Sequence, residues 1–384
     1  MTPNSQARPN YPLIDMLRAA AALMVVVYHV IVIGQWTIAS QATFIRLMHI
    51  GWIGVDCFFV ISGFVIALSA LKDYERQPLD FRRGFALRRL ARIAPLYILT
   101  MLLFVFLVKP ELLTALPKDQ WLQGVTHLLF IHNLFIPTAG AINSPNWSIG
   151  LEMQFYVFML FATPWLARVS ITRMFLTLLA VGWGYRYLVT FIYVPGGDEG
   201  FKQFFYTTQL PGTLDEFGMG MALAMAVTRG RGRLSAWLTP QWRHCAAWAL
   251  LAVVLSVVAW QTYWPRSSYW NVTPMIVFWR TLLAGAFVSW MAVAMTLPVA
   301  HWRVFKPFCY LGQISYGIYL WHLLVLLTLF DVPGLRGAHL FNRVLLGTLV
   351  LASLSWHWLE KPFMQRVKSP PRPVAPVPPV PLVG

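Results

Sequence analysis

Ten stretches of apolar residues recur along the chain, and each is long enough to cross a bilayer as a helix of about 20 residues. Short segments that carry most of the polar and charged residues separate these stretches. The pattern therefore predicts an all-α polytopic membrane protein with about ten transmembrane helices. The predicted spans are 13–34, 50–70, 93–108, 148–167, 174–193, 211–228, 245–264, 274–297, 309–330 and 341–360.

One more apolar segment, residues 121–136, affects the topology. If it were a full span, every later segment would change sides, and Arg229, Arg231 and Arg233 would lie outside. We therefore expect it to be a re-entrant or interfacial segment on the outer side of the membrane.

The composition excludes a water-soluble fold. Apolar residues make up 58% of the chain and charged residues 11%, whereas soluble domains have about 45–50% and about 25%. So few polar side chains could not cover the apolar surface in water. We therefore expect the solvent around most of the chain to be lipid.

The net charge of +16 fits either a nucleic-acid partner or the cytoplasmic loops of a membrane protein. With the N-terminus inside, 20 of the 30 Lys and Arg residues fall in inner segments and nine fall outside or at outer span ends, while Arg18 lies within the first span. This asymmetry favours the membrane reading, with both termini cytoplasmic and no nucleic-acid partner.

The domain organisation follows from these spans. Residues 1–12 form a cytoplasmic N-terminus, 13–363 the membrane domain and 364–384 a cytoplasmic tail rich in proline. The tail cannot continue a helix, and it is either inert or a ligand for a proline-binding partner. The first span is no cleavable signal peptide, because it contains Asp15 and Arg18.

Ionisable residues within the spans are candidates for function, because burying a charge in hydrocarbon costs about 2.5–3.5 kcal/mol. Arg18 and His29 are 11 residues apart, which places them on one helix face about 16 Å apart. A base and a cation at opposite ends of one span indicate a site that reaches through the membrane. The alternative is an Arg18 that extends to the lipid headgroups and a His29 bonded to a neighbouring helix.

Other spans add ionisable residues that could converge on His29. A carboxylate bonded to one of its nitrogens would orient the ring and raise its basicity. Each residue could equally make a structural hydrogen bond between helices. No HExxH-type spacing supports a metal site. The candidates are Asp56, Glu152, Asp215, Glu216 and His322.

A cluster of arginines follows the second span. Arg88 lies four residues and Arg89 three residues before Arg92, so a helix would place both of them next to Arg92. Arginine binds phosphate through two parallel hydrogen bonds, which suits a polyphosphate ligand, although anionic lipid would attract the same charges. No glycine-rich phosphate loop indicates an ATP motor or a dinucleotide fold.

Six segments together resemble acyltransferase family 3, a family of bacterial integral-membrane O-acyltransferases, from about Tyr11 to Phe363. The segments are LIDMLRAAAALMVVVYHV, GWIGVDCFFVISGF, RRLARIAPLY, NWSIGLEMQFY, ISYGIYLWHLLVL and WLEKPF.

The resemblance implies a ten-helix enzyme of the bacterial inner membrane. It would move an acyl group, commonly acetyl, from cytoplasmic acyl-coenzyme A to a hydroxyl group of a saccharide or another exported acceptor. The essential residues of the family correspond to Arg18, His29, Arg89, Arg92 and Glu152. Met153 stands where many members have a second acidic residue, and a fused extracytoplasmic esterase-like domain is not expected.

In this reading His29 is the base, and Glu152 or Asp56 orients it. His29 could instead carry the acyl group covalently. Arg89 and Arg92, helped by Arg88, would bind the coenzyme A phosphates, and Arg18 would line the route inward. The sequence leaves open the acceptor, the acyl chain and whether the protein acts as a homo-oligomer. The competing reading is a transporter or flippase with an intramembrane proton relay.

Overall fold

The computed structural model describes residues 11–36, 43–193, 200–266, 269–298 and 303–367. This part of the chain forms helices and turns and contains no β-strand. The N-terminal residues 1–10 and the proline-rich residues 368–384, both predicted to be cytoplasmic, lie outside the described residues.

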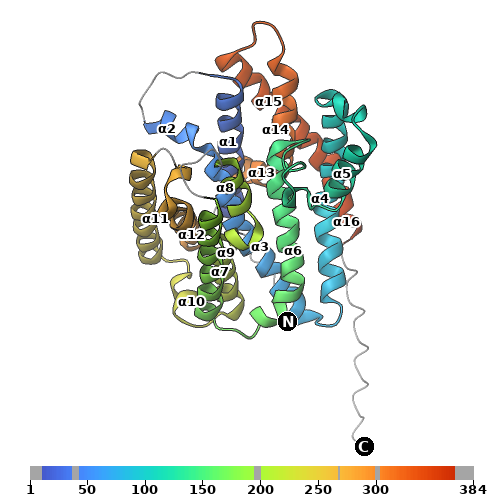
Figure 1. Cartoon of the computed structure of the whole chain (residues 1–384). Helices are drawn as coiled ribbons and strands as arrows, with labels where there is room; N and C mark the ends of the chain where they lie inside the picture. Colours follow the sequence, from blue (N-terminus) through green and yellow to red (C-terminus); the bar gives the residue numbers. More distant parts are fainter. Residues whose placement is uncertain (1–10, 37–42, 194–199, 267–268, 299–302, 368–384) are drawn as a thin grey trace, which may run out of the picture.

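Helices long and apolar enough to span a membrane account for most of the bundle (Figure 1). Eight helices in the described part meet this description, or nine if one bent pair is counted as a single span. They are α1 (Pro12–Ile33), Gly51–Arg76 with α3 (Gly54–Arg76), α4 (Phe81–Leu107), Ser144–Leu166 with α6 (Trp147–Leu166), α7 (Ile171–Ile192), α11 (Trp242–Tyr263), Met275–Thr296 with α12 (Arg280–Thr296), and Gly337–Arg366 with α15 (Gly337–Ser355) and α16 (Lys361–Arg366).

The bent pair joins α13 (Lys306–Gln313) to α14 (Ser315–Phe330) at an angle of 67°. The remaining span predicted from sequence corresponds to α9 (Leu210–Arg229), a 20-residue helix that is less apolar because it contains Asp215 and Glu216. Its side chains are mostly buried, so protein rather than lipid surrounds its acidic residues. The all-α polytopic membrane fold is thereby confirmed.

Shorter helices connect the spans. The segment expected to be re-entrant or interfacial contains α5 (Pro117–Leu128), whose 12 residues extend about 18 Å, well short of the bilayer core. Helix α4 begins at Phe81 rather than near residue 93, so the cluster of arginines that follows the second span lies within this helix. The other short helices are α2 (Thr43–His49), α8 (Gly200–Thr207) and α10 (Arg233–Trp237).

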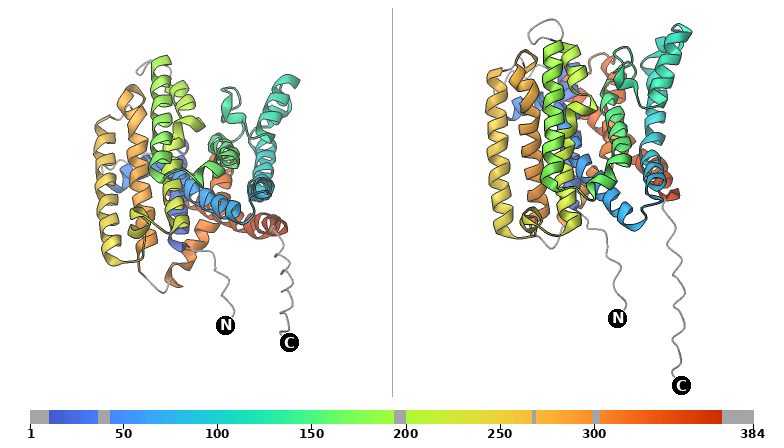
Figure 2. Two further views of the ribbon diagram at one scale, coloured as in Figure 1. Left: turned by 90° about the horizontal axis from the view of Figure 1, so that it is seen from below. Right: turned by 60° about the horizontal axis from the view of Figure 1, so that its bottom comes forward.

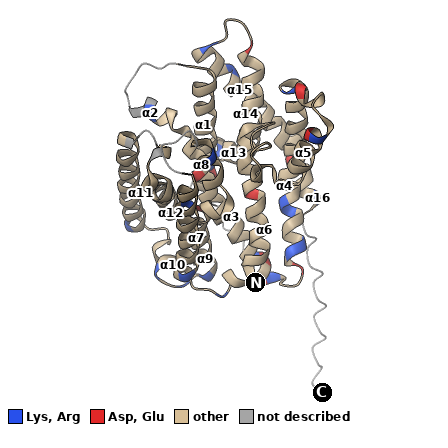
Figure 3. Cartoon of the chain, viewed as in Figure 1, with Lys and Arg blue, Asp and Glu red and all other residues tan. Residues whose placement is uncertain are grey.

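The segments expected to be inside lie together at one end of the bundle. The turn 77–80 and α10 lie at the lower end in Figure 1, whereas α5 and the turn 331–336 lie at the upper end. Lysine and arginine residues gather at the lower ends of α4 and of α9 with its neighbours (Figure 3). That the lower end faces the cytoplasm is an expectation from the charge count.

Helices α1 and α3 lie between a group formed by α7, α9, α11 and α12 and a group formed by α4 and α6 (Figures 1 and 2). Two glycines let α3 and α9 approach closely. A Cβ atom at Gly63 would lie 2.1 Å from the carbonyl oxygen of Phe217, and one at Gly220 would lie 2.0 Å from that of Val60. Such small residues are typical of close helix packing in membranes.

We predict that Gly220→Val destabilises the bundle by about 1–3 kcal/mol, because the added atoms would collide with backbone that cannot move aside. The melting temperature of the detergent-purified protein measures this effect. Gly184→Ala is the control, since a Cβ there meets nothing within 4 Å. Equal melting temperatures for the two variants would contradict the prediction.

Candidate active site

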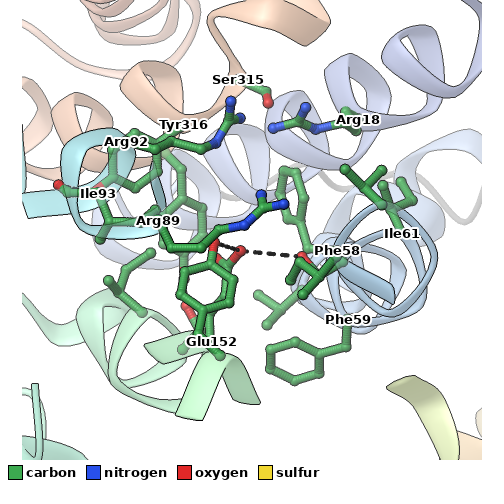
Figure 4. A pocket seen from close by; sticks show the side chains of 18 residues that line it. Arg18, Phe58, Phe59, Ile61, Arg89, Arg92, Ile93, Glu152, Ser315 and Tyr316 are labelled. Atoms are coloured by element: carbon green, nitrogen blue, oxygen red, sulfur yellow. Dashed lines mark hydrogen bonds between the residues drawn. The ribbon is translucent and has the colours of Figure 1, made fainter. Parts of the chain in front are cut away.

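Three arginine side chains point into one small cavity, which we call the inner cavity (Figure 4). Arg18 comes from α1, and Arg89 and Arg92 come from one face of α4. The cavity has a volume of about 100 Å³, and side chains of α3, α6 and α14 complete its wall. Residues that are 74 positions apart in the sequence therefore form a single cationic site.

Glu152 faces these arginines from α6 (Figure 4). Its carboxylate accepts hydrogen bonds from the Tyr156 hydroxyl at 2.6 Å and the Ser62 hydroxyl at 3.3 Å. The Arg89 guanidinium lies 5.6 Å from the centre of the Tyr156 ring. Within the described residues, Arg89 Nε and Ser315 Oγ are buried without a hydrogen-bond partner. Three cations against one carboxylate leave the cavity positively charged, with donors available for an anionic ligand.

Arg88, expected to help the other two arginines, points elsewhere. Its guanidinium donates a hydrogen bond to Asp73 at 2.7 Å, and Ser69 donates to the same carboxylate at 3.2 Å. Arg88 is not among the residues that line the inner cavity. It ties the start of α4 to the end of α3 instead.

His29 lies further along α1, and its ring is held by a second histidine. His29 Nδ1 is 2.9 Å from the carbonyl oxygen of Val25 and 3.2 Å from Nε2 of His322. Nδ1 of His322 is in turn 2.6 Å from the carbonyl oxygen of Tyr319. The side chain of His322 is fully buried.

These distances assign the protons of both neutral rings. A carbonyl oxygen only accepts hydrogen bonds, so Nδ1 of His322 carries a hydrogen and its Nε2 is a free acceptor. Nδ1 of His29 likewise carries a hydrogen, which lies between Val25 and His322. The lone pair of His29 is therefore on Nε2, which makes no hydrogen bond within the described part of the protein.

Neither carboxylate that was expected to orient His29 is bonded to it in the described part of the chain. Glu152 hydrogen bonds in the inner cavity, and Asp56 forms an ion pair with Arg280 at 3.1 Å. His322, proposed only as one of several residues that could converge on His29, takes the orienting position. An imidazole and a backbone carbonyl do what the sequence led us to expect of a carboxylate.

His29 lines a second, larger cavity of about 650 Å³, which we call the outer cavity. Asp56 and Arg280 also line it. The two cavities share Val55 and Tyr319 in their walls. The cationic group and His29 thus face two cavities that have two wall residues in common.

Two buried ion pairs were not predicted. Arg186 and Arg280 were counted among the outer charges, yet both are buried. Arg186 binds Asp215 at 2.7 Å, and Arg280 binds Asp56. Glu216 is fully buried beside Asp56. Opposite charges within apolar runs were the signal that could have revealed these pairs, since lone charges in the membrane are costly.

A pair of stacked histidines holds the segment next to the outer cavity. The rings of His127 and His132 are 4.3 Å apart, and both side chains are fully buried. Nε2 of His132 lies 3.0 Å from the carbonyl oxygen of Asn146, at the start of α6. Burial lowers the pKa of His127 to about 4 and that of His132 to about 3, so both rings are neutral at neutral pH. No pattern in the sequence indicated this pair.

The fold and the two cavities define a polytopic membrane protein with a cationic cavity next to a cavity that is lined by a histidine. The family described as an acyltransferase domain, acyltransferase family 3, matches residues 11–358. The chain belongs to this family, and the resemblance inferred from the six segments is confirmed.

The names of curated relatives are consistent with this family. The chain is 27% identical over 381 residues to the peptidoglycan O-acetyltransferase OatA of Listeria monocytogenes, covering 93% of this chain and 56% of the relative. It is 26% identical over 377 residues to the O-acetyltransferase OatA of Staphylococcus aureus, covering 93% and 58%. The chain therefore spans just over half the length of these relatives. No solved structure matches it.

Proposed function

We propose that this acyltransferase moves an acyl group, commonly acetyl, from cytoplasmic acyl-coenzyme A to a hydroxyl group of a saccharide presented on the other side of the bacterial inner membrane. The observation that carries the proposal is that Val55 and Tyr319 line both cavities. A thioester in the inner cavity and an alcohol in the outer cavity would meet there, beside His29. The names of the two O-acetyltransferase relatives support acetyl as the acyl group.

The inner cavity is the proposed donor site. Coenzyme A carries several phosphate charges, and Arg18, Arg89 and Arg92 supply fixed positive charge for them. The cavity of about 100 Å³ suits a narrow chain better than a nucleotide. The pantetheine arm would therefore enter the cavity, while the phosphates contact the guanidinium groups at its mouth.

His29 is the proposed base. Its Nε2 would take the proton of the acceptor hydroxyl as the oxygen attacks the thioester carbonyl. The C–S bond then breaks, the new ester leaves, and the proton on Nε2 passes to the coenzyme A thiolate. Donor and acceptor exchange one acyl group for one proton, so no external acid or base is consumed.

His322 is the proposed positioning residue for this step. When Nε2 of His29 is protonated, the Nδ1 hydrogen of His29 is donated more strongly to Nε2 of His322, which spreads the positive charge over two rings. The hydrogen bond from His322 to the carbonyl oxygen of Tyr319 keeps that acceptor available. The ring of His29 therefore stays in the tautomer that leaves Nε2 free.

We expect His29→Ala to lower acetyl transfer at least 100-fold, because the acceptor loses its base. Ester-linked acetyl on surface glycans, measured by mass spectrometry, should disappear, while the purified variant still binds acetyl-coenzyme A. His322→Gln should retain more activity than His322→Leu, since a glutamine oxygen can accept the Nδ1 hydrogen.

The matched control for these variants is His357→Gln. His357 is bonded to Tyr310 at 3.3 Å and lines neither cavity, so its loss should change little. Near-normal acetylation in the His29→Ala variant would refute the assignment of the base. Equal activity of His322→Gln and His322→Leu would refute the role of His322 as an acceptor.

Replacing both Arg89 and Arg92 by alanine should weaken binding of acetyl-coenzyme A at least tenfold, because charge-assisted hydrogen bonds to phosphate are lost. The difference in affinity between the wild-type protein and the variant should become smaller as the salt concentration is raised, because screening already weakens the wild-type contacts to phosphate. Calorimetric titration at two salt concentrations measures both effects. Arg83→Ala is the control on the same helix, as Arg83 is exposed and does not line the cavity. An equal loss in the control would contradict a specific phosphate site.

A further inference from the structure

The outer cavity differs from the inner cavity in its charge. Among the described residues that line it, Asp56 and Arg280 alone are charged, and they form an ion pair at 3.1 Å. Their charges cancel. The inner cavity has three arginines against one glutamate. An anionic ligand is therefore favoured in the inner cavity and gains nothing in the outer one.

The neighbouring Glu216 does not change this balance. It is fully buried, and it is not among the residues that line the cavity. The charged side chains that line the outer cavity are therefore one acid and one base, which form an ion pair.

Aromatic rings form much of the remaining wall. Trp52 packs near Tyr263 at 6.2 Å and Tyr269 at 6.3 Å, and the Arg280 guanidinium lies 5.6 Å from the centre of its ring. These contacts hold Trp52 in place on one side of the cavity. Asn133 and Gln209, which hydrogen bond to each other, also line the cavity.

The size of this cavity also suits a small organic group. Its volume of about 650 Å³ falls in the roughly 300–1,000 Å³ range of small-molecule sites. Flat apolar rings together with amides and an ion pair match the two kinds of surface that a sugar ring has. Its C–H face packs on an aromatic ring, and its hydroxyl edge takes hydrogen bonds.

We infer that the outer cavity binds a sugar unit without net charge as the acyl acceptor, with the C–H face of the sugar on Trp52. This inference rests on the proposed function and adds the place and the charge of the acceptor. Asp56 and Arg280 bind hydroxyl groups on the opposite edge, and one hydroxyl points to Nε2 of His29. A sugar acid is disfavoured, because Arg280 already neutralises Asp56 and a second carboxylate would meet no unpaired cation.

Binding without turnover tests the inference directly. Saturation-transfer NMR would measure binding of two neutral trisaccharides, chitotriose and maltotriose, and of the acidic trigalacturonate. The full chain in detergent is used, with no acyl donor present. We expect at least one neutral trisaccharide to bind at least tenfold more tightly than trigalacturonate. The inference is overturned if trigalacturonate binds as tightly, or if neither neutral sugar binds.

Two variants test the named residues. Trp52→Leu should weaken binding of the neutral trisaccharide at least tenfold. Trp358→Leu is the control and should leave this binding unchanged, because Trp358 is 75% exposed and lines neither cavity. Asp56→Asn should reduce the difference in affinity between the neutral trisaccharide and trigalacturonate, because Arg280 then has an unmatched charge. Melting temperatures verify that each variant is folded. Equal binding by the two tryptophan variants would overturn the role of Trp52.

Thiol release from acetyl-coenzyme A separates this inference from the proposed function. A protein that releases thiol with an acceptor but binds no neutral trisaccharide would overturn the inference alone. A protein that binds a neutral trisaccharide but transfers no acetyl group to any acceptor would overturn the proposed function alone.

Discussion

One hydrogen atom, on Nδ1 of His29, determines what the two cavities can do. The carbonyl oxygen of Val25 and Nε2 of His322 both compete for it, so it stays on Nδ1 and the lone pair stays on Nε2. In the other tautomer the atom facing the outer cavity would be a donor and could not accept the proton of an alcohol. Both partners of His29 are fixed by helix packing, Val25 by α1 itself and His322 by α14.

In the proposed reaction, two different ligands would reach this ring from two different cavities. The inner cavity is small and cationic, and the outer cavity is larger, aromatic and neutral. A membrane makes such a contrast effective, because charges are weakly screened where water is scarce. Under the proposed function each ligand would be drawn to its own cavity, and the two would approach each other near Val55 and Tyr319, which line both cavities.

The sequence predicted the helices and the members of the cationic site well, because both signals are local or carried by short motifs. Apolar runs located the spans, and Arg18, Arg89, Arg92 and Glu152 came from the family motifs. The partner of His29 could not be derived in this way. His322 is 293 residues away from His29 in the sequence. The helical period of 3.6 residues shows which residues share one face of a helix, but it does not show which other helix packs against that face.

The buried ion pairs show the same limit. Arg280 and Asp56 are 224 residues apart, and each lies near the end of a predicted span, where an exposed charge is equally plausible from sequence. Only the close packing of α3, α7, α9 and α12 brings the acids and the arginines together. Their pairing then makes the outer cavity neutral, a property that the net charge of the chain conceals.

The most direct test of a transfer across the membrane uses vesicles that contain the protein in one orientation. Acetyl-coenzyme A is supplied only on the side of the turn 77–80, and a saccharide acceptor only on the opposite side. We expect acetylated saccharide in this arrangement and none when the two compartments are exchanged. Product formed only when donor and acceptor share one compartment would contradict it.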